Sequence, residues 1–339
     1  MPAPLRHQRA PKDDAQADYD SLEQAARWYA SLQVNQVSDE QKIAWQEWLA
    51  ARPQNRRAWT HVEAVSHRFS PLRADGERQA AAVAISVSST QSIQTRKRRT
   101  VLRGLAALGG AGLAAWGAWR FTPVADTVLA WSADHHTAVG EIKDFFLADG
   151  SHIWLNTFSA LDVAFDDSRR LLRLRVGEVL VDTAKDGAGR PFFLTTDFGR
   201  MEALGTRFVV RQTRDYTQLT VFEGRVEIRN LAGQRAIVPA GQQRQFSADS
   251  IADAMPADAA RQAWSRGVIL AEDISLDELV IELARYQRAY VGVSPDIAGL
   301  RVSGRYPVAN LPKVLGMLER DLPIQISRPL PWWFSIRKK

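Results

Sequence analysis

The chain has 339 residues, enough for two or three compact domains, and its hydrophobic and charged fractions are those of a folded protein. It contains no cysteine, which excludes disulfides, thiol catalysis and cysteine-ligated zinc. The formal net charge is +6, and much of the basic excess lies in the run from Arg96 to Arg99 and at Arg103. Such a local run indicates nucleic-acid binding less than a basic domain face would.

The N-terminal region carries three amphipathic helical patterns. The first is expected to open at Asp20, with Glu23 as its capping-box partner. The second is expected to open at Ser38, and Pro53 separates it from a third that begins near Asn55. These patterns predict a small all-α domain.

Four tryptophans in this region exceed what so small a core usually hides. Trp48 and Trp59 fall on the core stripes, whereas Trp28 and Trp45 lie off these stripes or at their edges. An exposed aromatic residue on a small helical module is a candidate anchor for a partner. We therefore predict a protein-binding face around all four tryptophans.

Gly104–Trp119 is a run of 16 residues without a charge. Extended to 100–122, it is long enough to cross a bilayer core, with Arg103 and Arg120 near its ends. The basic run before it predicts, by the positive-inside rule, a cytoplasmic N-terminus and an external C-terminus. The alternative is a buried helix of a soluble domain.

Arg98 and Arg99, followed by apolar residues and Arg103, resemble a twin-arginine export signal. The alternative is a basic cluster that only sets membrane topology. Both interpretations stay open at this point.

After Pro123 the pattern changes to period 2 and short apolar runs. Runs at 145–147 and 153–155 flank an Asp-Gly turn, and Gly177 interrupts a longer run. Asp/Gly turns recur at the spacing typical of an all-β sandwich or barrel. We therefore expect a mostly-β domain.

The last seventy or so residues change pattern again. Ser275 and Asn310 are expected to cap two helices, each with an inward apolar stripe. Short apolar runs precede and follow both helices, which predicts a small α+β unit. The expected strands lie at 268–270, 290–293, 300–302, 324–327 and 333–336.

No motif of an enzyme stands out. The sequence lacks G-x-S-x-G, H-E-x-x-H and a phosphate-binding glycine loop. His135-His136 lacks metal-ligand spacing and is interpreted as a solvated loop, and Asp149 and Asp166-Asp167 as turn residues. We therefore expect no metal, no cofactor and no activity on a substrate.

Four short motifs, in this order, resemble the FecR family of transmembrane sigma-factor regulators, and the resemblance covers nearly the whole chain. The C-terminal unit is similar to the secretin and TonB N-terminal (STN) fold. The Trp332-Trp333 pair departs from the family pattern. The motifs lie at 45–59, 147–156, 203–210 and 221–226.

The resemblance implies an anti-sigma factor in the bacterial inner membrane, single-pass, with a cytoplasmic N-terminus and a periplasmic C-terminus. Its implied partners are a cytoplasmic extracytoplasmic-function (ECF) sigma factor, the signalling domain of a TonB-dependent siderophore receptor in the outer membrane, and envelope proteases that cleave the chain. The implied role is signal transduction that regulates transcription of iron-transport genes. The sigma factor is expected on the face around Trp28, Trp45, Trp48 and Trp59.

Gly205-Thr206 permits a sharper hypothesis. The threonine hydroxyl is placed to attack the glycine carbonyl in an N-to-O acyl shift, and the resemblance includes relatives that undergo such self-cleavage. The alternative is a plain strand-entry turn in which glycine supplies a positive φ.

Two other classes of function fit part of the sequence. A periplasmic envelope-binding or secretion scaffold anchored in the inner membrane would account for the STN-like unit, but it needs no tryptophan-rich helical module. Direct nucleic-acid binding is disfavoured because the helical region carries similar numbers of acids and bases.

The predicted organisation is therefore multidomain: an all-α cytoplasmic domain, one transmembrane helix, a mostly-β periplasmic domain and an α+β STN-like domain. The expected boundaries are a disordered tail at 1–19, the helical anti-sigma domain at 20–72, a linker with the basic cluster at 73–99, the transmembrane helix at 100–122, the FecR-type β domain at 123–250, a linker at 251–266 and the STN-like signalling domain at 267–339.

Overall fold

The computed structural model describes residues 18–33, 37–66, 132–203 and 205–339. Most of the expected tail and linker, the export signal at Arg98, Arg99 and Arg103, and the whole expected membrane segment lie outside these residues. Within the described ranges, no helix combines the length and the apolar character that a bilayer crossing needs.

The N-terminal module is helical, as predicted. Helix α1 (Tyr19–Leu32) begins earlier than predicted because the carboxylate of Asp18 accepts a hydrogen bond from the Ser21 backbone N–H at 2.7 Å. The expected cap pair of Asp20 and Glu23 is therefore wrong. Glu23 instead accepts from the Arg27 guanidinium at 2.6 Å, one helical turn further along.

Helix α2 (Asp39–Ala51) has the predicted start. The Ser38 side chain and the Gln41 side chain each bind the other's backbone N–H, which completes a capping box. A further helical stretch covers 53–66, so Pro53 lies at its first position, where the missing N–H costs nothing.

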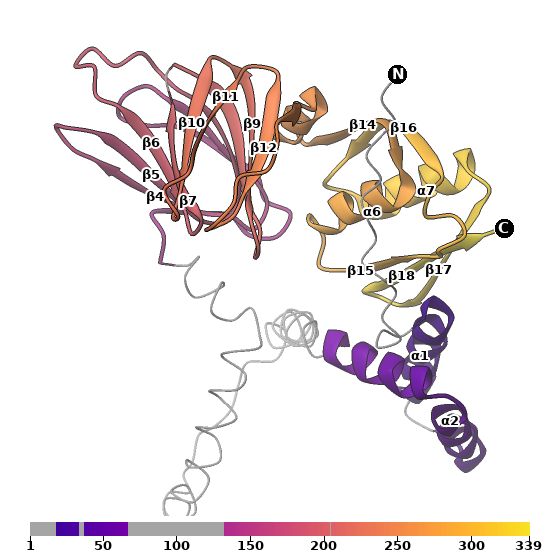
Figure 1. Ribbon diagram of the computed structural model, residues 1–339. Coiled ribbons are helices and arrows are strands. Elements are labelled where there is room, and N and C mark those ends of the chain that lie inside the picture. Colours follow the sequence, from indigo (N-terminus) through magenta and orange to yellow (C-terminus); the bar gives the residue numbers. More distant parts are fainter. Residues whose placement is uncertain (1–17, 34–36, 67–131, 204) are drawn as a thin grey trace, which may run out of the picture.

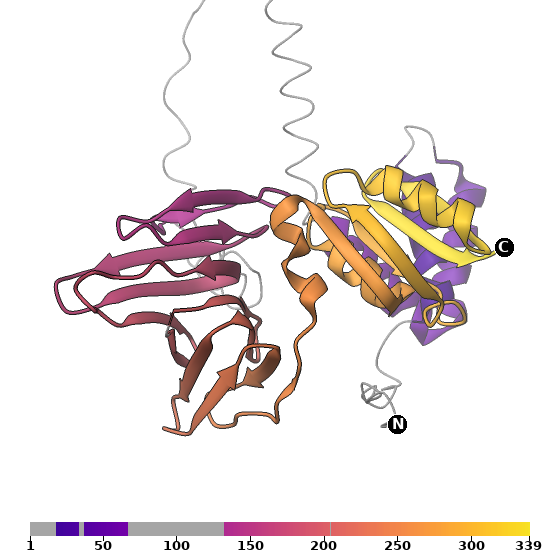
Figure 2. The same ribbon diagram turned by 90° about the horizontal axis from the view of Figure 1, so that it is seen from above.

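The β domain is a sandwich of two sheets that share one long strand (Figures 1 and 2). Among the described residues, 13 strands belong to it. They are β1 (His135–His136), β2 (Lys143–Phe146), β3 (His152–Leu155), β4 (Ala160–Phe165), β5 (Arg170–Asp182), β6 (Phe192–Thr196), β7 (Gly199–Ala203), β8 (Arg207–Gln212), β9 (Thr217–Glu223), β10 (Arg225–Asn230), β11 (Arg235–Pro239), β12 (Gln242–Phe246) and β13 (Met255–Pro256).

Strand β5 passes from one sheet to the other at Gly177. Its first half pairs with β4 and β6, and its second half pairs with β3 and β8. Gly177 has φ +91°, and a Cβ there would lie 2.1 Å from the Ser159 Oγ. The strand continues through this glycine, where the sequence pattern is interrupted, and changes sheets there. Both the backbone angle and the close approach of Ser159 require a glycine at this position.

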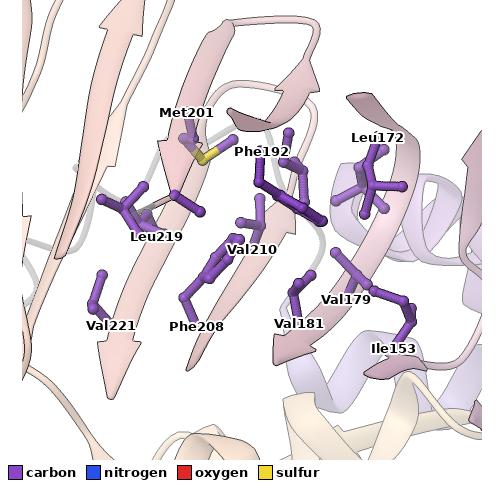
Figure 3. Packing of buried hydrophobic residues seen from close by; sticks show 14 of the residues in the cluster. Ile153, Leu172, Val179, Val181, Phe192, Met201, Phe208, Val210, Leu219 and Val221 are labelled. Atoms are coloured by element: carbon purple, nitrogen blue, oxygen red, sulfur yellow. The ribbon is translucent and has the colours of Figure 1, made fainter. Parts of the chain in front are cut away.

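The core of the sandwich lies between the two sheets. Phe192 and Met201 come from one sheet, and Phe208 and Leu219 come from the other; all four are fully buried (Figure 3). A fully buried side chain of this size stabilises the fold by about 1.5–3 kcal/mol. The alternation seen in the sequence thus corresponds to a shared apolar interior.

Two expectations in this region are wrong. His135-His136, expected as a loop, forms β1 against β4, and the His135 ring stacks on Phe145 with centroids 4.0 Å apart. The expected linker at 251–266 contains strand β13 and a 3₁₀ helix, η1 (Ala259–Arg266), which buries Trp264. Both segments owe their regular structure to contacts with residues that are distant in the sequence.

The C-terminal module has the predicted α+β composition. Its helices are capped as expected, by Ser275 with Glu278 and by Asn310. They pack between a two-stranded and a three-stranded sheet. The elements are β14 (Val268–Ser275), α6 (Leu276–Ala284), β15 (Tyr290–Val293), β16 (Arg301–Pro307), α7 (Leu311–Asp321), β17 (Ile324–Leu330) and β18 (Trp333–Lys338).

Helix α1 lies against the three-stranded sheet of this C-terminal module (Figure 1). Tyr19 of α1 donates its hydroxyl to the backbone carbonyl of Ile336 in β18 at 2.9 Å. Trp332 and Trp333 join the small apolar core of the helices. Helix α1 and the C-terminal module therefore form one continuous packed unit.

Candidate functional site

The Gly205–Thr206 turn lies directly before β8, at one end of the sandwich. Gly205 has φ +68°, which is the left-handed conformation that glycine was expected to supply. Thr183, just after β5, binds the turn at both sides of Thr206. Its hydroxyl accepts from the Thr206 N–H at 2.7 Å and donates to the Thr206 carbonyl at 3.1 Å. The turn is thus rigidly held through its backbone.

The hydroxyl of Thr206 is left out of this network. Thr206 is 3% exposed, and its Oγ1 is buried with no hydrogen-bond partner among the residues that the structure describes. A buried hydroxyl without a partner loses its hydration without compensation, at a cost of about 1–3 kcal/mol. The unpartnered hydroxyl belongs to the residue that directly follows the left-handed Gly205.

A second turn packs closely against the same peptide bond. Gly224, between β9 and β10, has φ +75°, and a Cβ there would lie 2.4 Å from the carbonyl oxygen of Gly205. It would also lie 2.7 Å from Cγ2 of Thr206. The motifs at 203–210 and 221–226, separate in sequence, are therefore two sides of one site.

The motif at 147–156 is tied into the fold by its polar residues. Asp149 accepts hydrogen bonds from the Ser151 N–H at 2.9 Å and from the Arg170 guanidinium at 2.8 Å. Burial alone would raise the pKa of Asp149, but the hydrogen bonds from Arg170 and Ser151 outweigh it and lower this pKa. Asp149 is thus a structural turn residue, as predicted.

The last residue of that motif, Asn156, lies at the junction between the β domain and the C-terminal module. Asn156 donates to the Glu178 carboxylate at 2.9 Å, and Glu178 forms an ion pair of 2.6 Å with Arg285, which follows α6. Glu282, on α6, binds Arg285 at 2.7 Å and Arg211 of β8 at 2.6 Å. This mostly buried charge network joins the two modules.

A cavity of about 310 Å³ lies beside the network. Its lining includes Trp264, Ile269 and Tyr286 as well as Glu282 and Arg285. The indole N–H of Trp264 is buried with no partner in the described part of the chain. Apart from Asn156, the residues of this junction lie outside the sequence motifs and come from segments that are separate in the sequence, so the junction was not predicted.

Trp45 and Trp59 are in ring contact, and Trp28 and Trp48 both lie beside Gln24; the binding face expected around all four stays a prediction. The rings of Trp45 and Trp59 have centroids 5.0 Å apart, and the indole N–H of Trp48 donates to Gln24 at 2.7 Å. All four are half-buried. Trp28, expected at an edge, lines a surface hollow together with Gln24, Arg27 and Ser31.

These features define the class of protein. It is a modular protein in which a small helical unit precedes a two-sheet β domain and an α+β unit. Residues 133–227 match the family described as FecR protein, and residues 23–65 match a domain of unknown function, DUF4880. The resemblance to the FecR family is therefore confirmed, and the sandwich contains a FecR domain.

Solved structures are similar as well. Two crystal structures of a candidate anti-sigma factor from Parabacteroides distasonis share 20% identity with this chain, with TM-scores of 0.48 and 0.49. Each match covers 60% of this chain and 97% of the other. No curated protein matches the sequence.

Proposed function

We propose that this protein is a single-pass inner-membrane anti-sigma factor, which relays a periplasmic signal to an ECF sigma factor in the cytoplasm. One observation carries the proposal: the DUF4880 match at 23–65 and the FecR match at 133–227 lie on opposite sides of the uncharged run Gly104–Trp119. This order supports a chain with one binding module on each side of a membrane.

The partners proposed for the two sides differ. On the cytoplasmic side, the half-buried tryptophans of the helical module supply aromatic anchors for the sigma factor. On the periplasmic side, the STN-like α+β module receives the signalling domain of a TonB-dependent siderophore receptor. Proteolysis by envelope proteases then releases the helical module, and iron-uptake genes are transcribed.

A site-specific crosslink tests the sigma contact in the full-length chain. A photoreactive amino acid at position 28 or 45 is expected to capture an ECF sigma factor in the bacterium that makes this protein. The same probe at Ile43, which is 56% exposed on α2, serves as the matched control. Equal capture from position 43, or no sigma factor from positions 28 and 45, would contradict the proposed site.

We also propose that the chain cleaves itself between Gly205 and Thr206. The Thr206 hydroxyl attacks the Gly205 carbonyl carbon, an ester forms, and the peptide C–N bond breaks as the nitrogen takes up the hydroxyl proton. Water then hydrolyses the ester to a Gly205 carboxylate and a free Thr206 hydroxyl. The unpartnered Oγ1 and the left-handed Gly205 support this step.

A further inference from the structure

The three-stranded sheet β15–β18–β17 has two faces with different contents. Along β18, Phe334 and Ile336 point into the core with α6 and α7, whereas Trp333 belongs to the cluster with the N-terminal helices. Residues Trp333, Ser335 and Arg337 alternate with the core residues and so share the second face. We call this second face, with Tyr290, the tryptophan face.

The side chains of the tryptophan face are buried, so another part of the molecule must cover this face. Trp333 is 1% exposed, its ring lies 3.9 Å from the Tyr290 ring between centroids, and its indole N–H donates to the Ser335 hydroxyl at 3.0 Å. Ser335 is 1% exposed. Without a cover, this face would expose a contiguous aromatic surface of the kind that marks a binding site.

The amphipathic helix α1 covers the tryptophan face, and its side chains are complementary to that face. Ala25 and Ala26 of α1 are fully buried, and such small side chains let the helix axis approach the indole rings. A Cβ on Gly292 of β15 would lie 3.3 Å from the Tyr19 ring, so the absence of a side chain there makes room for α1.

Helix α1 also makes polar contacts with the tryptophan face. Glu23 is 8% exposed, and its carboxylate accepts from the Ser327 hydroxyl at 3.3 Å and lies 3.9 Å from the Arg337 guanidinium. Tyr19 donates to the Ile336 carbonyl. An acid, a hydroxyl and small residues on one helix face thus meet a cation, a carbonyl and aromatic rings on the sheet.

We infer that the tryptophan face is a helix-binding surface, and that its occupant is α1 of the same chain before the chain enters the membrane. A chain with its ends on opposite sides of a bilayer cannot make this contact within one molecule. Insertion therefore opens it and leaves the face free for a helix of a periplasmic partner. Only this release step rests on the membrane topology proposed above.

The absence of cysteine makes a direct test possible, since any thiol crosslink in the chain must come from an engineered pair. Full-length Glu23→Cys/Ser327→Cys is synthesised cell-free and treated with a short bis-maleimide, with and without inverted inner-membrane vesicles. The reagent is needed because the contact joins the tips of the two side chains, too far from the Cβ atoms for a direct disulfide. His61→Cys/Tyr290→Cys, across rings 5.9 Å apart between centroids, is a second pair that keeps Glu23. Glu23→Cys/Gln234→Cys, with Gln234 exposed in the β domain, is the control pair.

Both test pairs are expected to form the thiol crosslink without vesicles, and vesicle-inserted molecules are expected not to form it, whereas the control pair forms none in either condition. Absence of the crosslink from both test pairs without vesicles would overturn the inference and leave the proposed function standing. A crosslink that still forms in vesicle-bound molecules, with both ends equally open to protease, would overturn the release step together with the proposed topology.

Discussion

A Cβ atom on Gly224 would lie 2.4 Å from the carbonyl oxygen of Gly205, so the turn between β9 and β10 is packed directly on the peptide that precedes β8. This contact places two FecR motifs at one site. It also makes Gly224 a support for the conformation of Gly205, which has a positive φ of its own.

Gly224→Ala should therefore destabilise the protein. The added methyl group must displace backbone, and the φ of +75° strains any residue other than glycine, for a combined loss of about 1–3 kcal/mol. Gly233→Ala is the matched control, because φ there is +82° but no heavy atom lies within 4 Å of its Cβ. Chemical denaturation measures both; an equal loss in the two variants would show that the contact with Gly205 contributes nothing.

Thr206→Ala should abolish self-cleavage, since it removes the only atom proposed to attack. On a denaturing gel, the wild-type chain is expected to give fragments 1–205 and 206–339, and the variant only the full-length band. Thr206→Ser keeps the hydroxyl and should still be cleaved. Thr220→Ala is the control, a buried threonine whose hydroxyl has a partner, Gln243 at 3.3 Å. A full-length wild-type band alone would exclude the reaction.

The charge network at the module junction predicts a pH dependence of stability. Burial alone would raise the pKa of Glu282. The guanidinium groups of Arg285, Arg211 and Arg261 outweigh burial and lower this pKa from 4.5 to about 2. Because the folded pKa is the lower one, the stabilisation is present above about pH 4.5 and is lost as the pH falls toward 2.

Glu282→Gln should consequently lower the free energy of unfolding at pH 7, by on the order of 2 kcal/mol, and the gap to the wild type should close toward pH 2. Glu272→Gln, at an exposed position of β14, is the control. Denaturation curves at a series of pH values give the comparison. A gap that stays constant with pH would assign the loss to packing instead of charge.

Trp28→Ala should weaken repression of the sigma factor while changing stability by only about 0.5 kcal/mol, because this half-buried ring lines a surface hollow. Trp59→Ala should destabilise the module, since its ring packs on both Trp45 and Tyr29. A transcription reporter and thermal unfolding separate the two effects. Unchanged repression in Trp28→Ala would remove this residue from the proposed face.

The proposed topology predicts asymmetric protease access. In spheroplasts carrying the full-length chain with a tag at each end, external protease should remove the C-terminal tag and spare the N-terminal one. Replacing Arg98 and Arg99 by Lys tests the export route in the same assay. Continued export without the twin-arginine translocase would leave the basic run with a topogenic role only.

Much of the local structure could be predicted because short-range chemistry determines it. Ser38, Ser275 and Asn310 cap the helices they were expected to cap, since each side chain binds a backbone N–H three residues ahead. The Asp-Gly turn at Asp149 joins two strands as expected. By contrast, the cap at Asp18 and the strand at His135 had no clear local signal.

The sequence by itself determined the order of modules, their secondary structure and the membership of the FecR domain, because periodicity, caps and turn residues act within a few positions. Only the tertiary structure decided which distant residues meet: Gly224 with Gly205, Glu178 with Arg285, and α1 with Trp333. Such pairs depend on how twisted sheets and helices pack in three dimensions, and no local pattern encodes that geometry.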